Sequence, residues 1–225
     1  MIVLGIDTST RFASVAIVQD GVVLAESTGD GRGHGSDLLV LIDAVCIGAA
    51  IGAHDLDAVA VGAGPGSFTG LRIGMATAKG IAFAAKCPLW AVSSLAALAH
   101  QVLCPQLDGR ELALVVAVLD ARKGEVYTGT YRRDDDRTVL LDTERVIAPE
   151  RLDPPFGSRI IGDFVETWEG HDVVYPITPS GKAVALLALE GARVDVLVGG
   201  APTYIRPSEA EVKYPDGVPG ALKKR

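Results

Sequence analysis

The fold is decided by residues 1–28, which read MIVLGIDTSTRFASVAIVQDGVVLAEST. The apolar run after the first methionine ends in Asp7, a pattern typical of a strand that is buried on both faces. Two more strand-like runs, 12–18 and 22–28, lie on either side of an Asp-Gly pair at 20–21, and such a pair favours a tight hairpin turn with positive φ. We therefore predict that three consecutive strands open the chain.

Helices and strands alternate through the rest of the first half. A glycine-rich stretch follows the third strand, and Ser36 is the predicted N-cap of a first helix over 37–50. A short buried strand at 57–62 leads into the glycine-rich loop 62–70. We predict a second helix from this loop to Ala85, a strand at 89–92, and a third helix from Ser94 to a point before Pro105.

The second half starts with the same plan. The apolar run 112–119 again ends in an acid, Asp120, and is followed by a charged turn, a strand, a polar turn and another strand. We predict the charged turn at 121–124, the strand at 125–132 and the polar turn at 134–136. An irregular connection at 149–157, a strand at 159–162 and a helix at 180–190 follow. The domains are therefore an N-terminal lobe, 1–104, and a C-terminal lobe, 105–225, whose last segment can return to the N-terminal lobe.

Two related α/β units, each with a mixed sheet opened by a three-stranded meander, resemble the duplicated fold of the actin, Hsp70 and sugar-kinase (ASKHA) superfamily. This is the fold class that we expect. It rests on the order of the elements.

Composition restricts the possible functions. The chain has 225 residues, 48% of them hydrophobic, and a net charge of −7. Such a chain buries a large core, and its acidity argues against nucleic-acid binding by the chain alone, because phosphate affinity comes from clustered Lys and Arg. Cys46, Cys87 and Cys104 are an odd, widely spaced set, which we interpret as buried thiols in a reducing compartment. The apolar run 44–53 is too short to span a bilayer, so we expect a cytoplasmic protein without a membrane partner.

Asp7, Thr8 and Ser9 resemble the phosphate-binding turn of that superfamily, in which a carboxylate holds a metal-bound water. The simpler interpretation, which we prefer, is that these side chains satisfy the backbone of a tight turn, so the phosphate turn is vestigial. The equivalent turn at 120–125 has one glycine and bulky charged residues, which makes a second phosphate cradle improbable.

The string 64–74, GPGSFTGLRIG, is the most informative in the chain, although no Walker A lysine follows it. In the helix that it starts, small residues recur every four positions, and the first helix is apolar nearly all round. One sheet covers only one side of a helix, so the other side needs a partner protein or the second half of the chain; we favour a partner. The predicted interface consists of Leu38, Leu41, Ile42, Val45, Gly70, Arg72, Gly74, Thr77, Ala78 and Ile81. Gly74→Leu or Leu41→Asp is then expected to break binding without unfolding the chain.

The sequence carries no recognisable catalytic or metal-binding pattern. His34, His54, His100 and His171 show no i, i+3 or i, i+4 spacing among themselves, so we expect no metal site. Ser67 lacks the surroundings of a catalytic elbow, and no nucleophile–histidine set can be assembled. We predict no catalytic residue and no cofactor.

Four strings together resemble the TsaB family, whose members are bacterial subunits required for making threonylcarbamoyladenosine in tRNA. They are IDTST at 6–10, the string 64–74, LDARKGEVY at 119–127 and PTYIR at 202–206. The resemblance covers nearly the whole chain. It implies a non-catalytic relative of TsaD, the threonylcarbamoyl transferase, that binds TsaD through its N-terminal lobe. The implied partners are TsaD, the ATPase TsaE, tRNA only through the complex, and a second copy of the chain when it is free.

The segment that would hold the metal in TsaD supports this interpretation. TsaD carries an HxxGH-like segment after the second helix and strand, whereas this chain reads PLWAVSSLAAL at 88–98, without a metal ligand. The chain departs from the family pattern at 31–36, which is richer in glycine, and in a short second lobe.

Two enzymatic alternatives stay open at this point. The first is an ATP-dependent kinase of the same superfamily that uses Asp7, against which the degraded turn at 120–125 argues. The second is a glycoprotein peptidase, for which no metal or nucleophile set is found. The sequence does not determine the oligomeric state, residual nucleotide binding, direct tRNA contact or the docking of TsaE.

Overall fold

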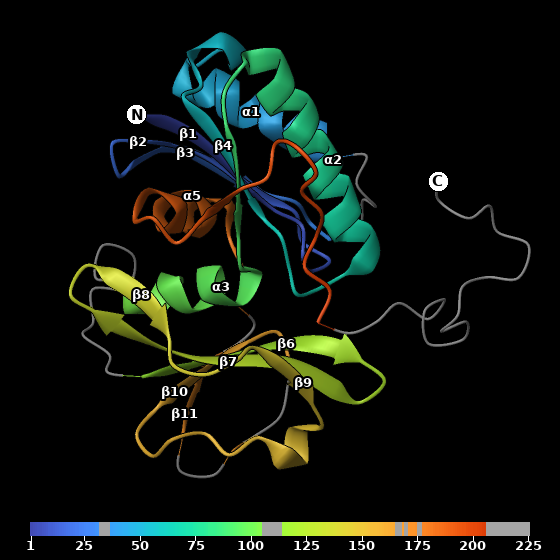
Figure 1. The fold of residues 1–225 in the computed structure, drawn as a ribbon, viewed down its shortest axis with the longest axis vertical. Coiled ribbons are helices and arrows are strands. Elements are labelled where there is room, and N and C mark those ends of the chain that lie inside the picture. The colour runs from blue at the N-terminus through green and yellow to red at the C-terminus, as the bar shows by residue number, and fades with distance from the viewer. Residues whose placement is uncertain (32–36, 105–113, 165–167, 169–170, 175–176, 206–225) are drawn as a thin grey trace, which may run out of the picture.

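Two lobes, each built on a mixed sheet of six strands, make up the protein (Figure 1). The computed structural model describes residues 1–31, 37–104, 114–164, 168, 171–174 and 177–205. The sheet of the N-terminal lobe has the order β12-β5-β4-β1-β2-β3, and that of the C-terminal lobe has the order β11-β10-β6-β7-β8, with β9 also paired to β7. The α/β two-lobe fold is therefore the one that the sequence predicts.

The strands of the N-terminal sheet are β1 (Ile2–Asp7), β2 (Ser14–Gln19), β3 (Val22–Thr28), β4 (Ala58–Gly62), β5 (Leu89–Val92) and β12 (Val194–Asp195). Those of the C-terminal sheet are β6 (Val115–Arg122), β7 (Glu125–Asp134), β8 (Arg137–Leu140), β9 (Arg145–Ile147), β10 (Arg159–Gly162) and β11 (Asp172–Val174). The helices are α1 (Leu38–Ala49), α2 (Phe68–Ala85), α3 (Ser94–Leu103) and α5 (Gly181–Leu189), with short 3-10 turns at η1 (Ala53–Asp55) and η2 (Pro149–Arg151).

Each sheet opens with the predicted antiparallel meander, β1-β2-β3 in one lobe and β6-β7-β8 in the other. In the first hairpin, Asp20 and Gly21 both have positive φ, of 50° and 83°, as the Asp-Gly pair requires. The second meander differs from the prediction because β6 continues past Asp120 to Arg122. Its register shifts between these two residues, so a bulge takes up the first part of the predicted turn 121–124, and the turn itself is confined to residues 123 and 124.

Alternate residues of β1 point into two different cores. Leu4 and Ile6 pack with α1 and α2 on one face of the N-terminal sheet. Val3 packs with α5 on the other face. This explains why β1 is apolar at every position: both of its faces are covered by helices (Figure 1).

The end of the described chain returns to the N-terminal lobe. An added Cβ on Gly5 of β1 would lie 2.0 Å from the Gly181 carbonyl oxygen, so the two glycines let α5 lie directly on this sheet. After α5, β12 pairs with β5 at the edge of the same sheet. The segment that begins at 181 therefore packs with the N-terminal lobe; the prediction placed it within 105–225 and allowed the last segment to return to that lobe.

Helix α3 connects the two lobes. It packs on β6 and β7 of the C-terminal sheet and also contacts α5, so the order of layers is α1 and α2, sheet, α5, α3, sheet (Figure 1). Against the C-terminal sheet, a separate core is formed mainly by α3 with β6 and β7. The three-residue strands β9 and β11 and the two-residue β12 were not predicted, since runs this short carry no periodicity.

Several smaller predictions have definite outcomes. Cys46, Cys87 and Cys104 are free thiols, and the last two are buried, as predicted. The predicted N-cap Ser36 and the predicted strand start at 112 lie outside the described residues. Among the helices of the described ranges, none combines the length and apolar character that a bilayer span requires.

Candidate functional site

Asp7 stands at the carboxyl end of β1 and is fully buried. Its Oδ1 accepts hydrogen bonds from the Ser9 backbone N–H at 2.8 Å and from the Ser9 hydroxyl at 2.6 Å, and its Oδ2 accepts one from the Ser94 hydroxyl at 2.8 Å. Both carboxylate oxygens are thus engaged by the chain itself. The arrangement favours the interpretation of Asp7 as a turn-stabilising residue over that of a ligand for a metal-bound water.

Burial raises the pKa of Asp7 above its ordinary value of 3.8, and the hydrogen bonds from Ser9 and Ser94 oppose this shift. The space around the carboxylate is also filled. A Cβ added to Gly62 at the end of β4 would lie 1.9 Å from Oδ2, so glycine is needed there. No room is left beside Asp7 for a phosphate on the side of β4.

The glycines of the string 64–74 fit α2 against the turn that follows β1. Added Cβ atoms on Gly66, Gly70 and Gly74 would lie 2.3 Å from the Ser9 carbonyl oxygen, 2.1 Å from the Thr8 carbonyl oxygen and 2.2 Å from Thr8 Oγ1. The Thr8 hydroxyl donates to the Gly70 carbonyl at 2.8 Å, and the Ser67 N–H donates to the Ser9 carbonyl at 2.6 Å. The predicted small-residue groove exists, but the chain's own turn occupies it.

The structure corrects half of the predicted interface residues. The sheet side of α1 and α2 is buried in the N-terminal core, because these helices cover the sheet with their most regular apolar and small-residue stripes. Residues buried in this way are Leu38, Ile42, Val45, Gly74 and Ala78. They therefore present no surface to a partner. Gly70, Leu41, Thr77 and Ile81 are half-buried.

Arg72 is exposed but already engaged by residues 200–205, which lie along α2. Its guanidinium stacks 3.8 Å above the Phe68 ring, and its Nε donates to the Tyr204 hydroxyl at 3.2 Å. The Tyr204 ring lies 5.2 Å from that of Phe68, and Lys79 Nζ donates to the Gly200 carbonyl. Arg72 thus makes contacts within the chain, and its predicted contact with another protein stays a prediction.

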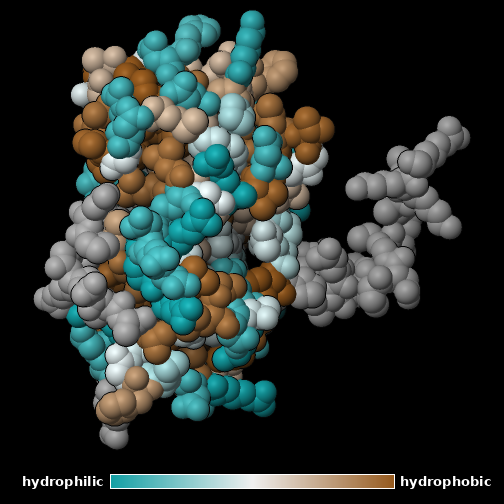
Figure 2. All heavy atoms as spheres, turned by 60° about the vertical axis from the view of Figure 1, so that its left-hand side comes forward, coloured by the Kyte–Doolittle hydropathy of each residue, from teal (hydrophilic) through white to brown (hydrophobic). Residues whose placement is uncertain are grey.

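The opposite side of both helices is exposed and was not singled out from the sequence. We call it the outer α1–α2 face and define it as Leu39, Val40, Ile47, Ala76, Gly80, Phe83 and Ala84. Leu39, Val40, Ile47 and Phe83 are 63%, 67%, 73% and 80% exposed. Ala76, Gly80 and Ala84 repeat every four residues on the exposed side of α2, and among the described residues nothing lies within 4 Å of a Cβ added to Gly80. Figure 2, in which the N-terminal lobe is uppermost, shows hydrophobic residues reaching the surface of this lobe.

The second turn, between β6 and β7, differs from the first. Asp120 is 33% exposed, its Oδ1 accepts from the Arg122 N–H at 2.7 Å, and its Oδ2 lies 3.2 Å from Arg122 Nη1. Arg122 and Lys123 both take positive φ, of 64° and 58°, which places two long cationic side chains on the turn. Bulky side chains thus occupy positive-φ positions at which a phosphate cradle needs glycine to let the phosphate approach the backbone, which argues against a second phosphate site and so against the kinase alternative.

A hollow of about 580 Å³ lies between the segment 140–144 and residues 203 and 205. One of its two carboxylates, Glu144, accepts hydrogen bonds from the Tyr131 hydroxyl at 2.6 Å and from the Ser93 hydroxyl at the N-cap of α3. Burial raises the pKa of Tyr131, so the phenol stays protonated and donates to Glu144. Glu144 thus connects the two lobes, and nothing in the contact resembles an acid–base pair.

One polar cluster was missed. His100 and Cys104 are spaced i, i+4 on α3, but the spacings were compared only among histidines. With Glu190 they bring three metal-ligating atoms within 4.8 Å of one another. Burial lowers the pKa of His100 to about 4, with Arg133 as a second cause, so the imidazole is neutral at physiological pH. Its 3.7 Å contact with Glu190 is therefore a contact of a neutral ring.

Comparison with known proteins gives a consistent result. A family model described as TsaD, tRNA N6-adenosine threonylcarbamoyltransferase, matches residues 20–197. The tRNA threonylcarbamoyladenosine biosynthesis protein TsaB of Bacillus subtilis is 30% identical over 95% of this chain and 98% of that protein. The TsaB of Escherichia coli is 38% identical over 67% of this chain and 64% of that protein.

Matches to the relatives from Escherichia coli and Haemophilus influenzae each span 64% of those proteins. A solved structure of YeaZ from Pseudomonas aeruginosa is 30% identical and superposes with a TM-score of 0.77, over 90% of this chain and the whole of that one. The superposition includes both lobes, since it covers nearly all of this chain.

Proposed function

The chain belongs to the TsaB family of tRNA threonylcarbamoyladenosine biosynthesis proteins, and from this we propose that it is a non-catalytic subunit that binds and supports a TsaD-type threonylcarbamoyl transferase. The observation that carries the proposal is the exposed outer α1–α2 face. Four large apolar side chains there are each more than 60% exposed on two neighbouring helices. Such a concentration marks a protein-binding surface more often than a bare surface of a monomer.

The state of the phosphate turn supports a binding role. Asp7 gives both carboxylate oxygens to Ser9 and Ser94, and the segment 88–98 offers no histidine or carboxylate ligand. A transferase or kinase needs an activated group close to its substrate. In this chain the carboxylate of the predicted phosphate turn is instead engaged by hydrogen bonds within the fold.

The outer α1–α2 face suits a partner that presents helices. Ala76, Gly80 and Ala84 leave a shallow track along α2, while Leu39, Val40 and Ile47 on α1 and Phe83 on α2 supply apolar area. Small residues let helix backbones approach closely, and large apolar side chains beside them supply the burial energy. We propose that the equivalent helices of a TsaD-type protein dock here.

The other partners follow from the same family membership. We propose a TsaE-type ATPase as a further component, with tRNA contacted only through the complex, because a net charge of −7 disfavours direct binding to phosphates. When the TsaD-type partner is absent, the same face is proposed to pair two copies of the chain.

Isothermal titration of the full chain with its TsaD-type partner tests the proposal. Ile47→Asp places an unpaired carboxylate in the contact, which costs several kcal/mol, so we expect affinity to fall by about 100-fold or more. The matched control is Phe156→Asp, because Phe156 is 98% exposed in the C-terminal lobe. Unchanged affinity of a folded Ile47→Asp variant would contradict the proposed face.

A further inference from the structure

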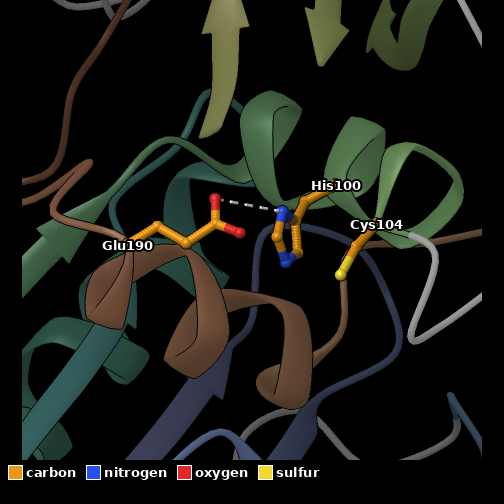
Figure 3. Close-up of side chains that lie close together, drawn as sticks. All are labelled: His100, Cys104 and Glu190. Atoms are coloured by element: carbon orange, nitrogen blue, oxygen red, sulfur yellow. Dashed lines mark ion pairs between the residues drawn. The ribbon is translucent and has the colours of Figure 1, made fainter. Parts of the chain in front are cut away.

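A group of metal-ligating side chains lies between the lobes, at the ends of two helices. His100 is in α3, Cys104 is the C-cap of α3, and Glu190 is the C-cap of α5. One ring nitrogen, the sulfur and one carboxylate oxygen all lie within 4.8 Å of one another. Figure 3 shows the three side chains converging from the two helices.

His100 indicates that this cluster lacks a member. The ring is fully buried, and its Nδ1 lies 2.9 Å from Thr138 Oγ1. Its Nε2 is also buried and has no hydrogen-bond partner within the described part of the chain. A buried polar atom without a partner is unusual in a folded protein. A histidine whose one nitrogen is hydrogen-bonded while the other is free is the arrangement found in metal-binding histidines.

Glu190 is oriented by neighbours in a comparable way. Arg133 Nη1 donates to Oε1 at 2.7 Å, and the Thr138 N–H donates to Oε2 at 3.4 Å. Oε2 also lies 3.7 Å from His100 Nδ1, the ring nitrogen that Thr138 engages, so the carboxylate borders the imidazole ring. The Glu190 side chain is 18% exposed, so an ion can reach the cluster from solvent.

We propose that His100, Cys104 and Glu190 bind one divalent transition-metal ion, and that Zn²⁺ is the best match. A set of one nitrogen, one sulfur and one oxygen suits Zn²⁺, and three protein ligands leave a fourth tetrahedral position. When the ion binds, the Cys104 thiol releases its proton to solvent and the sulfur lone pair forms the bond to the metal; no electron is transferred.

The electrostatics of the cluster favour a dication. The Cys104 thiolate and the Glu190 carboxylate together balance its two charges. Helices α3 and α5 both end at these residues, and the carbonyl groups at a helix C-terminus carry partial negative charge. Arg133 opposes the ion, but it is paired with Glu190 through the other oxygen.

The role that this site fits is structural. Helix α3 packs on β6 and β7 of the C-terminal sheet, and α5 packs on β1 and β2 of the N-terminal sheet. An ion held by both helices would therefore fix the two lobes relative to each other. This inference is independent of the proposed partner surface, because α1 and α2 contribute no ligand.

Titration of the chelator-treated full chain with Co²⁺, followed by Zn²⁺, tests the inference. We expect one Co²⁺ per chain, a thiolate-to-cobalt absorption band, and displacement of cobalt by Zn²⁺ with a rise in Tm. Cys104→Ala should lose the band and weaken cobalt binding by more than about 100-fold. Cys87→Ala is the matched control, since Cys87 is a buried thiol in the N-terminal core, and it should keep both.

Glu190→Gln, which preserves side-chain volume and the thiol, should weaken cobalt binding by at least about 10-fold and alter the visible spectrum. Circular dichroism establishes the fold of each variant. Absence of saturable cobalt binding, or a thiolate band that survives in Cys104→Ala, overturns the inference. If Cys104→Ala does not fold, Glu190→Gln decides: unchanged affinity and spectrum in that variant also overturn it.

Discussion

The inner and outer sides of α1 and α2 are alike in composition but opposite in environment. Leu38 is 1% exposed and packs on the sheet, whereas the next residue, Leu39, is 63% exposed. On α2, Gly74 fits against Thr8, whereas no residue in the part of the chain that the structure describes lies within 4 Å of a Cβ added to Gly80. The fold needs the inner residues and leaves the outer ones free. The proposed docking of a partner protein would give the outer residues a use that the fold does not.

Enlarging one glycine on each side of α2 tests most directly whether the two sides differ in their contribution to stability. Gly74→Leu drives a side chain into the buried Thr8 side chain, and this overpacking should lower the free energy of unfolding by about 3 kcal/mol or more. Gly80→Leu should raise it by up to about 1 kcal/mol, because glycine is a poor helix former. Urea unfolding followed by circular dichroism measures both. Equal effects would show that the two sides of α2 do not differ.

The structure changes the outcome that the sequence predicts for Gly74→Leu. That expectation was loss of partner binding with an intact fold. Since Gly74 touches Thr8 of the same chain, the variant should lose the fold first.

Adjacent leucines on α1 provide a second contrast. Leu38→Ala removes a buried side chain and leaves a cavity, so it should lower the free energy of unfolding by about 2–5 kcal/mol. Leu39→Ala should change it by no more than about 0.5 kcal/mol. Denaturant unfolding of the two variants under identical conditions is the measurement. A costly Leu39→Ala would mean that the outer side contributes to the core of the free chain.

Partner binding should depend on the outer leucine of α1 and not on an exposed leucine of the C-terminal lobe. Leu39→Ala is expected to weaken binding to the TsaD-type partner about tenfold, or about 1.4 kcal/mol, because it removes apolar area from the proposed contact. Leu140→Ala, at a 41% exposed leucine of the C-terminal lobe, should leave binding unchanged. Titration calorimetry of both variants decides the matter. Equal affinities would move the interface away from α1.

The smallest expected effect concerns Asp7, which lies beside the inner side of α2 in the turn that contains Thr8. Its pKa is raised in the folded chain, so the folded state disfavours the charged form. The stability that Asp7 contributes is therefore present below pH 3.8 and is lost as pH rises through its raised folded pKa. Asp7→Asn removes this dependence and keeps an acceptor for Ser9.

Unfolding of the wild-type chain and of Asp7→Asn, measured from about pH 4 to about pH 8, tests this sign. The stability of Asp7→Asn relative to wild type should increase with pH. A difference that stays constant, or that decreases, would show that Asp7 is stabilised as the anion.

Element order could be predicted from the sequence because each signal was local. The apolar run before Asp7, the Asp-Gly hairpin and the glycine-rich string before α2 each determine a conformation over a few residues. The short strands β9, β11 and β12 could not be predicted, because two or three residues become a strand only when a neighbouring strand pairs with them.

The candidate site was harder to predict than the fold. The two helices of the partner surface were chosen for being apolar all round, but the more regular stripe of each turned out to face the sheet. A stripe of small residues has the same pattern whether it meets a partner helix or the chain's own turn. The stripe at Ala76, Gly80 and Ala84 was present in the sequence, and nothing local ranked it above the stripe at Gly70, Gly74 and Ala78.

The sequence by itself determined the two α/β units, the paired meanders and the family, because these depend on local periodicity and on contiguous strings. Only the tertiary structure decided which side of each helix is free, that Asp7 is saturated by Ser9 and Ser94, and that α5 returns to the first sheet. It alone brought Glu190 to His100 and Cys104. These are contacts between residues far apart in the chain, and their partners are chosen by packing, which no short stretch of sequence contains.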